Sequence, residues 1–116
     1  MRSEADAVGR IADMREAIAA IEQAIQGHDA TTFPTDRTVR DAVLWNLTVL
    51  GEAVSGIPDE VQTAHAEIPW AKMRGTRNLL VHEYFGIDDQ IVWETATSNV
   101  VPLAAPLRRL RDQLTG

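Results

Sequence analysis

The chain has 116 residues, which suits a single domain over residues 1–116, and it has no cysteine, which excludes disulfides, a thiolate nucleophile and a zinc–thiolate site. Its net charge of -6 argues against a general nucleic-acid binder, because nonspecific affinity for phosphate backbones rests mainly on lysine and arginine. No apolar stretch approaches the roughly 18 residues of a membrane span, and the first residues lack the pattern of a signal peptide, so we expect a soluble cytoplasmic protein.

The first two predicted helices are amphipathic. Residues 3–26 carry an apolar stripe at spacings of three and four, and Gly27 can take the left-handed conformation that ends a helix. After a loop, a second helix is expected to begin behind Thr35 or Asp36 as its N-cap and to run to about Ser55. The two helices should pack through their apolar stripes.

Three positions of the second helix need comment. Asn46 lies beside the apolar stripe, which predicts either an interhelical polar contact or an interface position. Glu52 is interpreted as an ordinary exposed helix residue. The preceding Gly51 would allow a neighbouring helix to come close, which is the one reason to consider this acid further.

Two more helices follow in the middle of the chain. Pro58 suits the first position of a short helix that reaches about Ala66. A longer helix is expected from about Trp70 to Glu83, with Gly86 after its end. Most polar side chains of chemical interest fall in this longer helix.

The last predicted helix is interrupted. Asp88 or Asp89 caps its start, and an apolar stripe continues from there to the C-terminus. Pro102 and Pro106 fall inside this pattern, and because each lacks an N–H donor we expect a kink or break near Val101. With no competing strand pattern, the sequence predicts an all-α, antiparallel up-and-down bundle of four main helices plus a short one.

The candidate functional residues gather in one stretch of the chain. They are Lys72, Arg74, Arg77, Asn78, His82 and Tyr84. The three cations suggest a small anion site on an acidic body, with Lys72 and Arg74 as candidate RNA contacts, although three cations on a solvated helix face would leave the same pattern.

An Arg and a His suit phosphodiester cleavage without a metal or other cofactor. The imidazole of His82 can accept or donate a proton near neutral pH, and the guanidinium of Arg77 can bind phosphate oxygens. Asn78 could orient His82, and Tyr84 could contact phosphate or ribose. On an ideal helix, however, Arg77 and His82 are offset by about 140°. Either the helix distorts or ends near Val81, or the two side chains converge where two copies of the helix meet.

The motif also resembles a known family. The run from Ile68-Pro69-Trp70 to Gly86, with Arg77, four residues, His82, one residue and Tyr84, is similar to the HepT-like branch of the HEPN superfamily. The segments 50–53 and 92–94 are also similar to that family.

The resemblance implies a specific function. It implies an α-helical homodimer whose cleft, built from both protomers, is a metal-independent ribonuclease site with Arg77 and His82 as the catalytic pair and Asn78 as a supporting residue. It further implies the toxin of a toxin–antitoxin pair, with RNA, tRNA among the types, as the substrate. The partner would be a minimal nucleotidyltransferase antitoxin that inactivates the toxin by AMPylation of Tyr84. An adenylate there would add negative charge and bulk about two residues from His82.

Two other interpretations remain open. The chain could be a HEPN module that holds a nucleotide or a partner in the same cleft without cleaving anything. It could also be a helical dimerisation domain in which Arg77 and His82 are ordinary surface residues.

Overall fold

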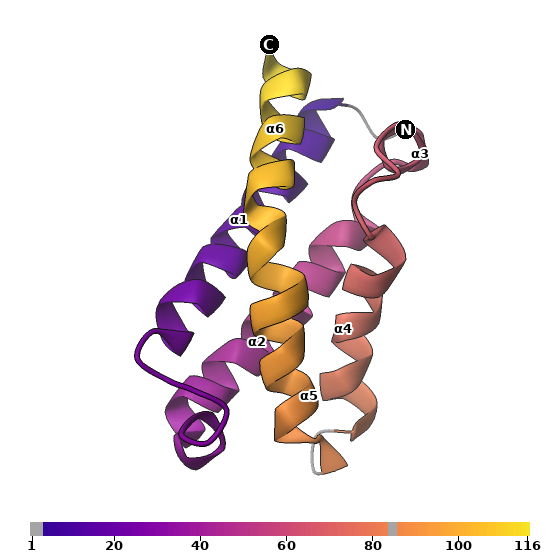
Figure 1. The fold of residues 1–116 in the computed structure, drawn as a ribbon. Coiled ribbons are helices and arrows are strands. Elements are labelled where there is room, and N and C mark those ends of the chain that lie inside the picture. Colours follow the sequence, from indigo (N-terminus) through magenta and orange to yellow (C-terminus); the bar gives the residue numbers. More distant parts are fainter. Residues whose placement is uncertain (1–3, 84–85) are drawn as a thin grey trace.

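The computed structural model describes residues 4–83 and 86–116, with side chains for residues 6–78 and 86–116, and every regular element in this part is a helix (Figure 1). The α-helices are α1 (Glu4–Ile25), α2 (Arg37–Ser55), α3 (Asp59–Ala64), α4 (Trp70–Glu83), α5 (Asp89–Glu94) and α6 (Ala104–Thr115). Shorter pieces are the 3-10 helices η1 (Phe33–Thr35) and η4 (Val101–Leu103) and the π-helix η3 (Thr95–Val100).

The predicted all-α bundle is confirmed. Helix α1 packs on α2 and α6, and α2 packs on α4. The elements α5, η3, η4 and α6 follow one another as one long rod; in the view of Figure 1, α1 crosses behind this rod and α4 lies to its right. The core draws on α1, α2 and the rod; its largest fully buried side chains include Ile11, Met14, Leu47, Leu50 and Leu107. The apolar stripes predicted for the first two helices therefore face each other.

The start of α2 is fixed by its predicted cap. Gly27 has a φ of 80°, which confirms the left-handed residue after α1. Of the two candidate caps, Asp36 takes the role, because its carboxylate accepts a hydrogen bond from the N–H of Val39 at 3.2 Å. Phe33 in η1 is fully buried and anchors the loop to the core.

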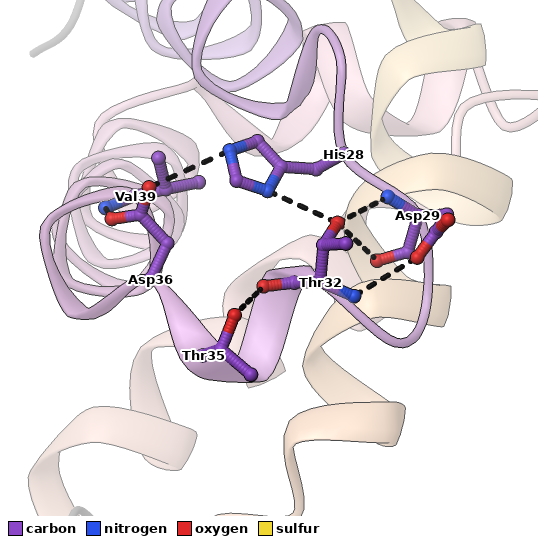
Figure 2. Close-up of polar contacts among 6 residues, drawn as sticks. All are labelled: His28, Asp29, Thr32, Thr35, Asp36 and Val39. Carbon is purple, nitrogen blue, oxygen red and sulfur yellow. Dashed lines mark hydrogen bonds and ion pairs between the residues drawn. The ribbon is translucent and has the colours of Figure 1, made fainter.

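Polar contacts hold the loop between α1 and α2 (Figure 2). The ring of His28 lies between Thr32 and Asp36, with Nδ1 3.3 Å from Thr32 Oγ1 and Nε2 3.6 Å from an Asp36 carboxylate oxygen. Asp29 accepts hydrogen bonds from the hydroxyl of Thr31 and from the N–H groups of Thr32 and Thr31, and these bonds lower its pKa to about 2. This loop therefore anchors the N-terminal end of α2, while α2 also packs on α4.

The predicted break in the last helix is present. Asp88 caps α5, since its carboxylate accepts a hydrogen bond from the N–H of Gln90 at 2.8 Å. The chain then passes through the π-turns of η3 and the single 3-10 turn of η4 before α6 resumes regular geometry. Pro102 explains this irregularity, because it has no N–H to donate to the carbonyl of Ser98 and its ring crowds the preceding turn. The expected break near Val101 falls at the junction of η3 and η4.

Two details differ from expectation. Within the described part of the chain Asn46 makes no bond to another helix; its Nδ2 donates to the carbonyl of Ala42 in the preceding turn of α2 at 2.8 Å. The half-buried amide is thus satisfied locally, and its role as an interface residue stays a prediction. The short helix α3 ends at Ala64, two residues before the expected end. Among the described residues, no helix is both long and apolar enough to cross a membrane.

Candidate active site

The candidate site starts from Arg77 on α4. Its Nε lies 2.6 Å from Oε1 of Glu52 on α2, and both side chains remain about half exposed, at 50% and 55%. This contact occupies the Nε–H, while the two Nη groups of a guanidinium carry further donors. Arg77 is therefore held in place by a carboxylate yet keeps N–H groups for an anion.

The same region shows why α2 and α4 come so close. A Cβ atom on Gly51 would lie only 2.9 Å from Cβ of Arg77 and 3.1 Å from the carbonyl oxygen of Met73. Buried Thr76 adds a polar contact, because its Oγ1 lies 2.8 Å from the carbonyl oxygen of Leu47 and 2.7 Å from that of Met73. A side chain at position 51 would push the helices apart. The glycine is thus what allows Glu52 to reach Arg77.

Glu52 is the functional candidate that sequence reasoning missed. It was interpreted as an ordinary exposed residue, and the structure instead pairs it with the predicted catalytic arginine. Charge and helical spacing on α2 give no sign of this pairing, since Glu52 lies on the face away from the core. Two signals pointed to this position: the family resemblance of segment 50–53, and the adjacent Gly51, which allows the close approach of α4.

The three cations of α4 do not form one patch. Arg74 donates from Nη1 to Oε1 of Gln62 on α3 at 2.8 Å, and Arg77 contacts Glu52 on α2. Lys72 is exposed, lines a groove toward η3 and makes no hydrogen bond or ion pair within the described part of the chain. The cations therefore face three different elements. As RNA contacts, Lys72 and Arg74 stay predictions.

The second half of the motif is described only in part. Helix α4 continues to Glu83, so the alternative in which it ends near Val81 is wrong. His82 lies in the last turn of α4, but its side chain falls outside the described residues, as does the whole of Tyr84. Asn78 is exposed on α4, four residues before His82. The catalytic role of His82, the supporting role of Asn78 and the modification of Tyr84 stay predictions.

A large apolar side chain lies on the same surface as the Arg77–Glu52 pair. Trp45 is 63% exposed although it belongs to a helix with a well-packed core face. It precedes Glu52 by seven residues, so the two side chains share one face of α2, about 10 Å apart along the axis. Trp45 and Ile91 are the two large apolar side chains that remain exposed among the described residues.

The described side chains offer no ready metal centre. No three of the described His, Asp or Glu side chains gather closely enough to hold a metal ion. The carboxylate in contact with Arg77 belongs to Glu52 alone, and hard cations in proteins usually take several oxygen ligands.

Comparison with known proteins shows the family of this chain. The sequence profile "Ribonuclease HepT-like" matches residues 14–110, which include Gly51, Glu52 and the whole of α4. A protein of Thermococcus cleftensis named "probable ribonuclease HepT" is 34% identical over 85% of this chain and 90% of its own length.

Two further relatives carry similar names. A protein of Caldanaerobacter subterraneus subsp. tengcongensis named "putative RNase" is 31% identical over 74% of this chain and 77% of its own length. A protein of Methanocaldococcus jannaschii, also named "putative RNase", is 40% identical over 74% of each chain. No solved structure matches this chain. The profile match over residues 14–110 and these relatives show that the chain belongs to the HepT-like ribonuclease family.

Proposed function

We propose that this protein is a metal-independent endoribonuclease toxin whose active site, with Arg77 and His82 as the catalytic pair, lies in a cleft between two copies of the chain. The observation that carries the proposal is the Arg77–Glu52 contact of 2.6 Å on the α2–α4 surface. It fixes a half-exposed guanidinium, whose Nη groups make no hydrogen bond within the described part of the chain, on the helix that bears His82 five residues later. Membership of a ribonuclease family gives the phosphodiester of RNA as the group to be bound.

The chemistry requires three tasks of the chain. A base removes the proton from the attacking hydroxyl, an acid protonates the leaving oxygen, and a cation stabilises the charge that builds on the phosphate. Arg77 serves as the cation through its Nη groups. His82 serves as base or acid, because imidazole titrates near neutral pH. Asn78 would orient the imidazole, because residues four apart on a helix are neighbours.

Two arguments favour a cleft built from two copies. Because α4 stays helical to Glu83, the positions of Arg77 and His82 differ by about 140° around one helix axis, and one copy does not turn them toward one point. In addition, Trp45 exposes 63% of its surface on the α2 face that bears Glu52. A second copy that covered Trp45 about a two-fold axis would bring its own α4 next to Arg77.

The first test is cleavage by single variants. Purified wild-type protein should cleave RNA in the presence of EDTA, and Arg77→Ala or His82→Ala should lose at least about 100-fold in rate, as expected for removal of a group that acts on the transition state. Circular dichroism and gel filtration should show that both variants keep the fold and the dimer. Loss of wild-type cleavage on chelation, or unchanged cleavage by both variants, would contradict the proposal.

Mixing the two inactive variants tests whether the cleft is shared. If Arg77 of one copy works with His82 of the other, half of the randomly mixed dimers carry one intact site of two, and about a quarter of the wild-type rate should return. If both residues act within one copy, no mixed dimer has an intact site and activity stays absent. Coexpression of the two variants with different tags isolates the mixed dimer directly.

We also propose that Tyr84 is the point of control, AMPylated by a minimal nucleotidyltransferase antitoxin. The phosphate added there would repel the RNA backbone and occupy the space beside His82. Intact-mass measurement after incubation with the partner and ATP should show one or more AMP units on the wild-type chain and none on Tyr84→Phe. An adduct that persists on Tyr84→Phe would place the modification elsewhere.

The main alternative is a non-catalytic module that binds a nucleotide or a protein partner through the same surface. Exposed Trp45 would suit such a partner as well as it suits a second copy. Tight partner or nucleotide binding together with no RNA cleavage at micromolar protein would favour this alternative. Growth arrest that is relieved by Arg77→Ala would favour the toxin.

A further inference from the structure

A groove opens along the side of α4 that borders η3. It has a volume of about 490 Å³ and lies between α4 and the irregular segment of η3 and η4. Lys72, Gly75 and Thr76 line it from α4, while Ile91, Ser98 and Asn99 line it from the opposite wall. Its volume is within the range of about 300–1,000 Å³ that is typical of small-molecule sites.

Local features of both walls keep the groove open. Gly75 has no side chain to fill it, and a Cβ atom there would meet no other atom within 4 Å. On the other wall, Pro102 interrupts regular helical hydrogen bonding, so η3 follows π-helical rather than α-helical geometry. Ile91 is 51% exposed at one end of the groove, which leaves an apolar surface uncovered.

The polar groups of the groove divide into two classes. The hydroxyls of Thr76 and Thr95 are engaged by backbone carbonyls, the first by Leu47 and Met73 and the second by Ile91 at 2.7 Å. The side chains of Lys72, Ser98 and Asn99 make no hydrogen bond or ion pair within the described part of the chain. The groove thus presents a cation, an amide and a hydroxyl that are free to bind a ligand.

The charges of the lining residues indicate the charge of that ligand. The chain has 17 acidic residues and a net charge of -6, yet none of the described residues that line the groove is acidic. Its one charged lining residue among those described is Lys72. An apolar groove with a single cation and an unpaired amide fits a ligand that has a flat apolar body, a hydrogen-bonding edge and an anionic group.

We propose that this groove binds one nucleotide, with the base between the apolar walls, the base edge at Asn99 and Ser98, and the phosphate at Lys72. An asparagine amide can both donate to and accept from a base edge, and apolar walls suit the faces of an unstacked base. Gly75 and Thr76 immediately precede Arg77, so the nucleotide would lie within a few residues of the proposed catalytic cation. The inference rests on the proposed function, because it makes this nucleotide one unit of the RNA chain that Arg77 would help to cleave.

The same chemistry is present in a free mononucleotide and in one unit of an RNA chain. Binding should therefore be measured with the four nucleoside 5′-monophosphates, with inorganic phosphate and with a short RNA made uncleavable by 2′-O-methylation. We expect the backbone amide NMR signals of Ser98 and Asn99 to shift with nucleotides and much less with phosphate. If only the RNA shifts them, the groove serves a unit of the chain; if monophosphates suffice, it also takes free nucleotide.

Variants of the walls test the site directly. Gly75→Leu should fill the groove without a clash and weaken nucleotide binding at least about tenfold, a difference of about 1.4 kcal/mol in binding free energy. Lys72→Ala and Asn99→Leu should weaken it to a similar or smaller extent. Gly9→Leu is the matched control, because Gly9 is exposed on a helix, its Cβ would also meet nothing within 4 Å, and it lies outside the groove.

These measurements separate failure of the groove from failure of the proposed ribonuclease. Nucleotide binding that Gly75→Leu abolishes in a protein without cleavage would uphold the groove and overturn the ribonuclease. Cleavage and RNA binding that are unchanged in Gly75→Leu and Asn99→Leu would overturn the groove and leave the ribonuclease intact. Shifts at Ser98 and Asn99 that appear only with a second copy or a partner protein would also overturn the nucleotide site.

Discussion

The two sides of α4 are built in different ways. Toward α2, the helix is in close contact through Gly51, its buried Thr76 hydrogen-bonds to a backbone carbonyl of α2, and Arg77 pairs with Glu52. Toward η3, it borders an open groove where Gly75 has no neighbour within 4 Å of its missing Cβ. One side therefore positions the proposed catalytic cation, and the other leaves room for a ligand. This division explains how one helix can hold a guanidinium firmly while remaining accessible to RNA.

The largest effect is expected from Gly51→Ala on the α2 side of α4. The same change from glycine to alanine at Gly75 later tests the side that borders the groove. Gly51→Ala would place a Cβ atom 2.9 Å from Cβ of Arg77 and 3.1 Å from two backbone atoms, neither of which can move without shifting α4. We expect a loss of about 1–3 kcal/mol in the free energy of unfolding, typical of overpacking. Urea titration at a fixed protein concentration measures it, since the stability of a dimer depends on concentration. Unchanged stability would mean that α4 is not held closely by α2.

Much of this arrangement could be predicted from the sequence, and the reasons are local. Helical periodicity and the residues Gly27, Asp36 and Asp88 defined the ends of helices because caps act on the nearest turn. Pro102 predicted the break in the last helix for the same reason. The bounds Trp70 and Glu83 of α4 also matched expectation.

What could not be predicted depends on which helix faces which. The pairing of Glu52 with Arg77 joins residues 25 positions apart and needs the relative rotation of α2 and α4, which periodicity does not give. The groove beside Lys72 likewise depends on the path of η3 after Pro102. The separation of Lys72, Arg74 and Arg77 could not be predicted either, because nearby positions on one helix point to different neighbours.

A smaller effect on the same packed side is expected from Thr76→Val. The hydroxyl of Thr76 has one proton to share between the carbonyl oxygens of Leu47 and Met73, so its removal costs one hydrogen bond in a buried place. We expect a loss of about 1 kcal/mol in the free energy of unfolding. Thr76→Ser, which keeps the hydroxyl, is the control that separates the hydrogen bond from the methyl packing. If Thr76→Ser is as destabilising as Thr76→Val, the methyl group of Thr76 contributes as much to stability as its hydrogen bond.

On the side of α4 that borders the groove, the corresponding substitution should raise the free energy of unfolding. Gly75→Ala adds a Cβ atom where nothing lies within 4 Å and removes the backbone freedom of glycine in a helix. We therefore expect a gain of about 0.5–1 kcal/mol in the free energy of unfolding. The same titration used for Gly51→Ala measures it. A loss of stability would show that some element closes over Gly75, and the groove would then not be open in solution.

The smallest effect on stability, and the sharpest test of positioning, is expected from Glu52→Gln. Because the Glu52–Arg77 pair is about half exposed, its loss should change the free energy of unfolding by less than about 1 kcal/mol. Activity should fall more than stability, by on the order of tenfold and mainly in kcat, since a displaced guanidinium would stabilise the transition state less well. Glu52→Ala should lower kcat more than Glu52→Gln does, because glutamine can still accept a hydrogen bond from Nε of Arg77.

Glu16→Gln is the control for this prediction. It lies on an exposed face of α1, makes the same change in net charge and should leave kcat unchanged. If kcat instead follows the unfolding free energy across all three variants, Glu52 supports only the fold, and Arg77 needs no partner on α2 to act.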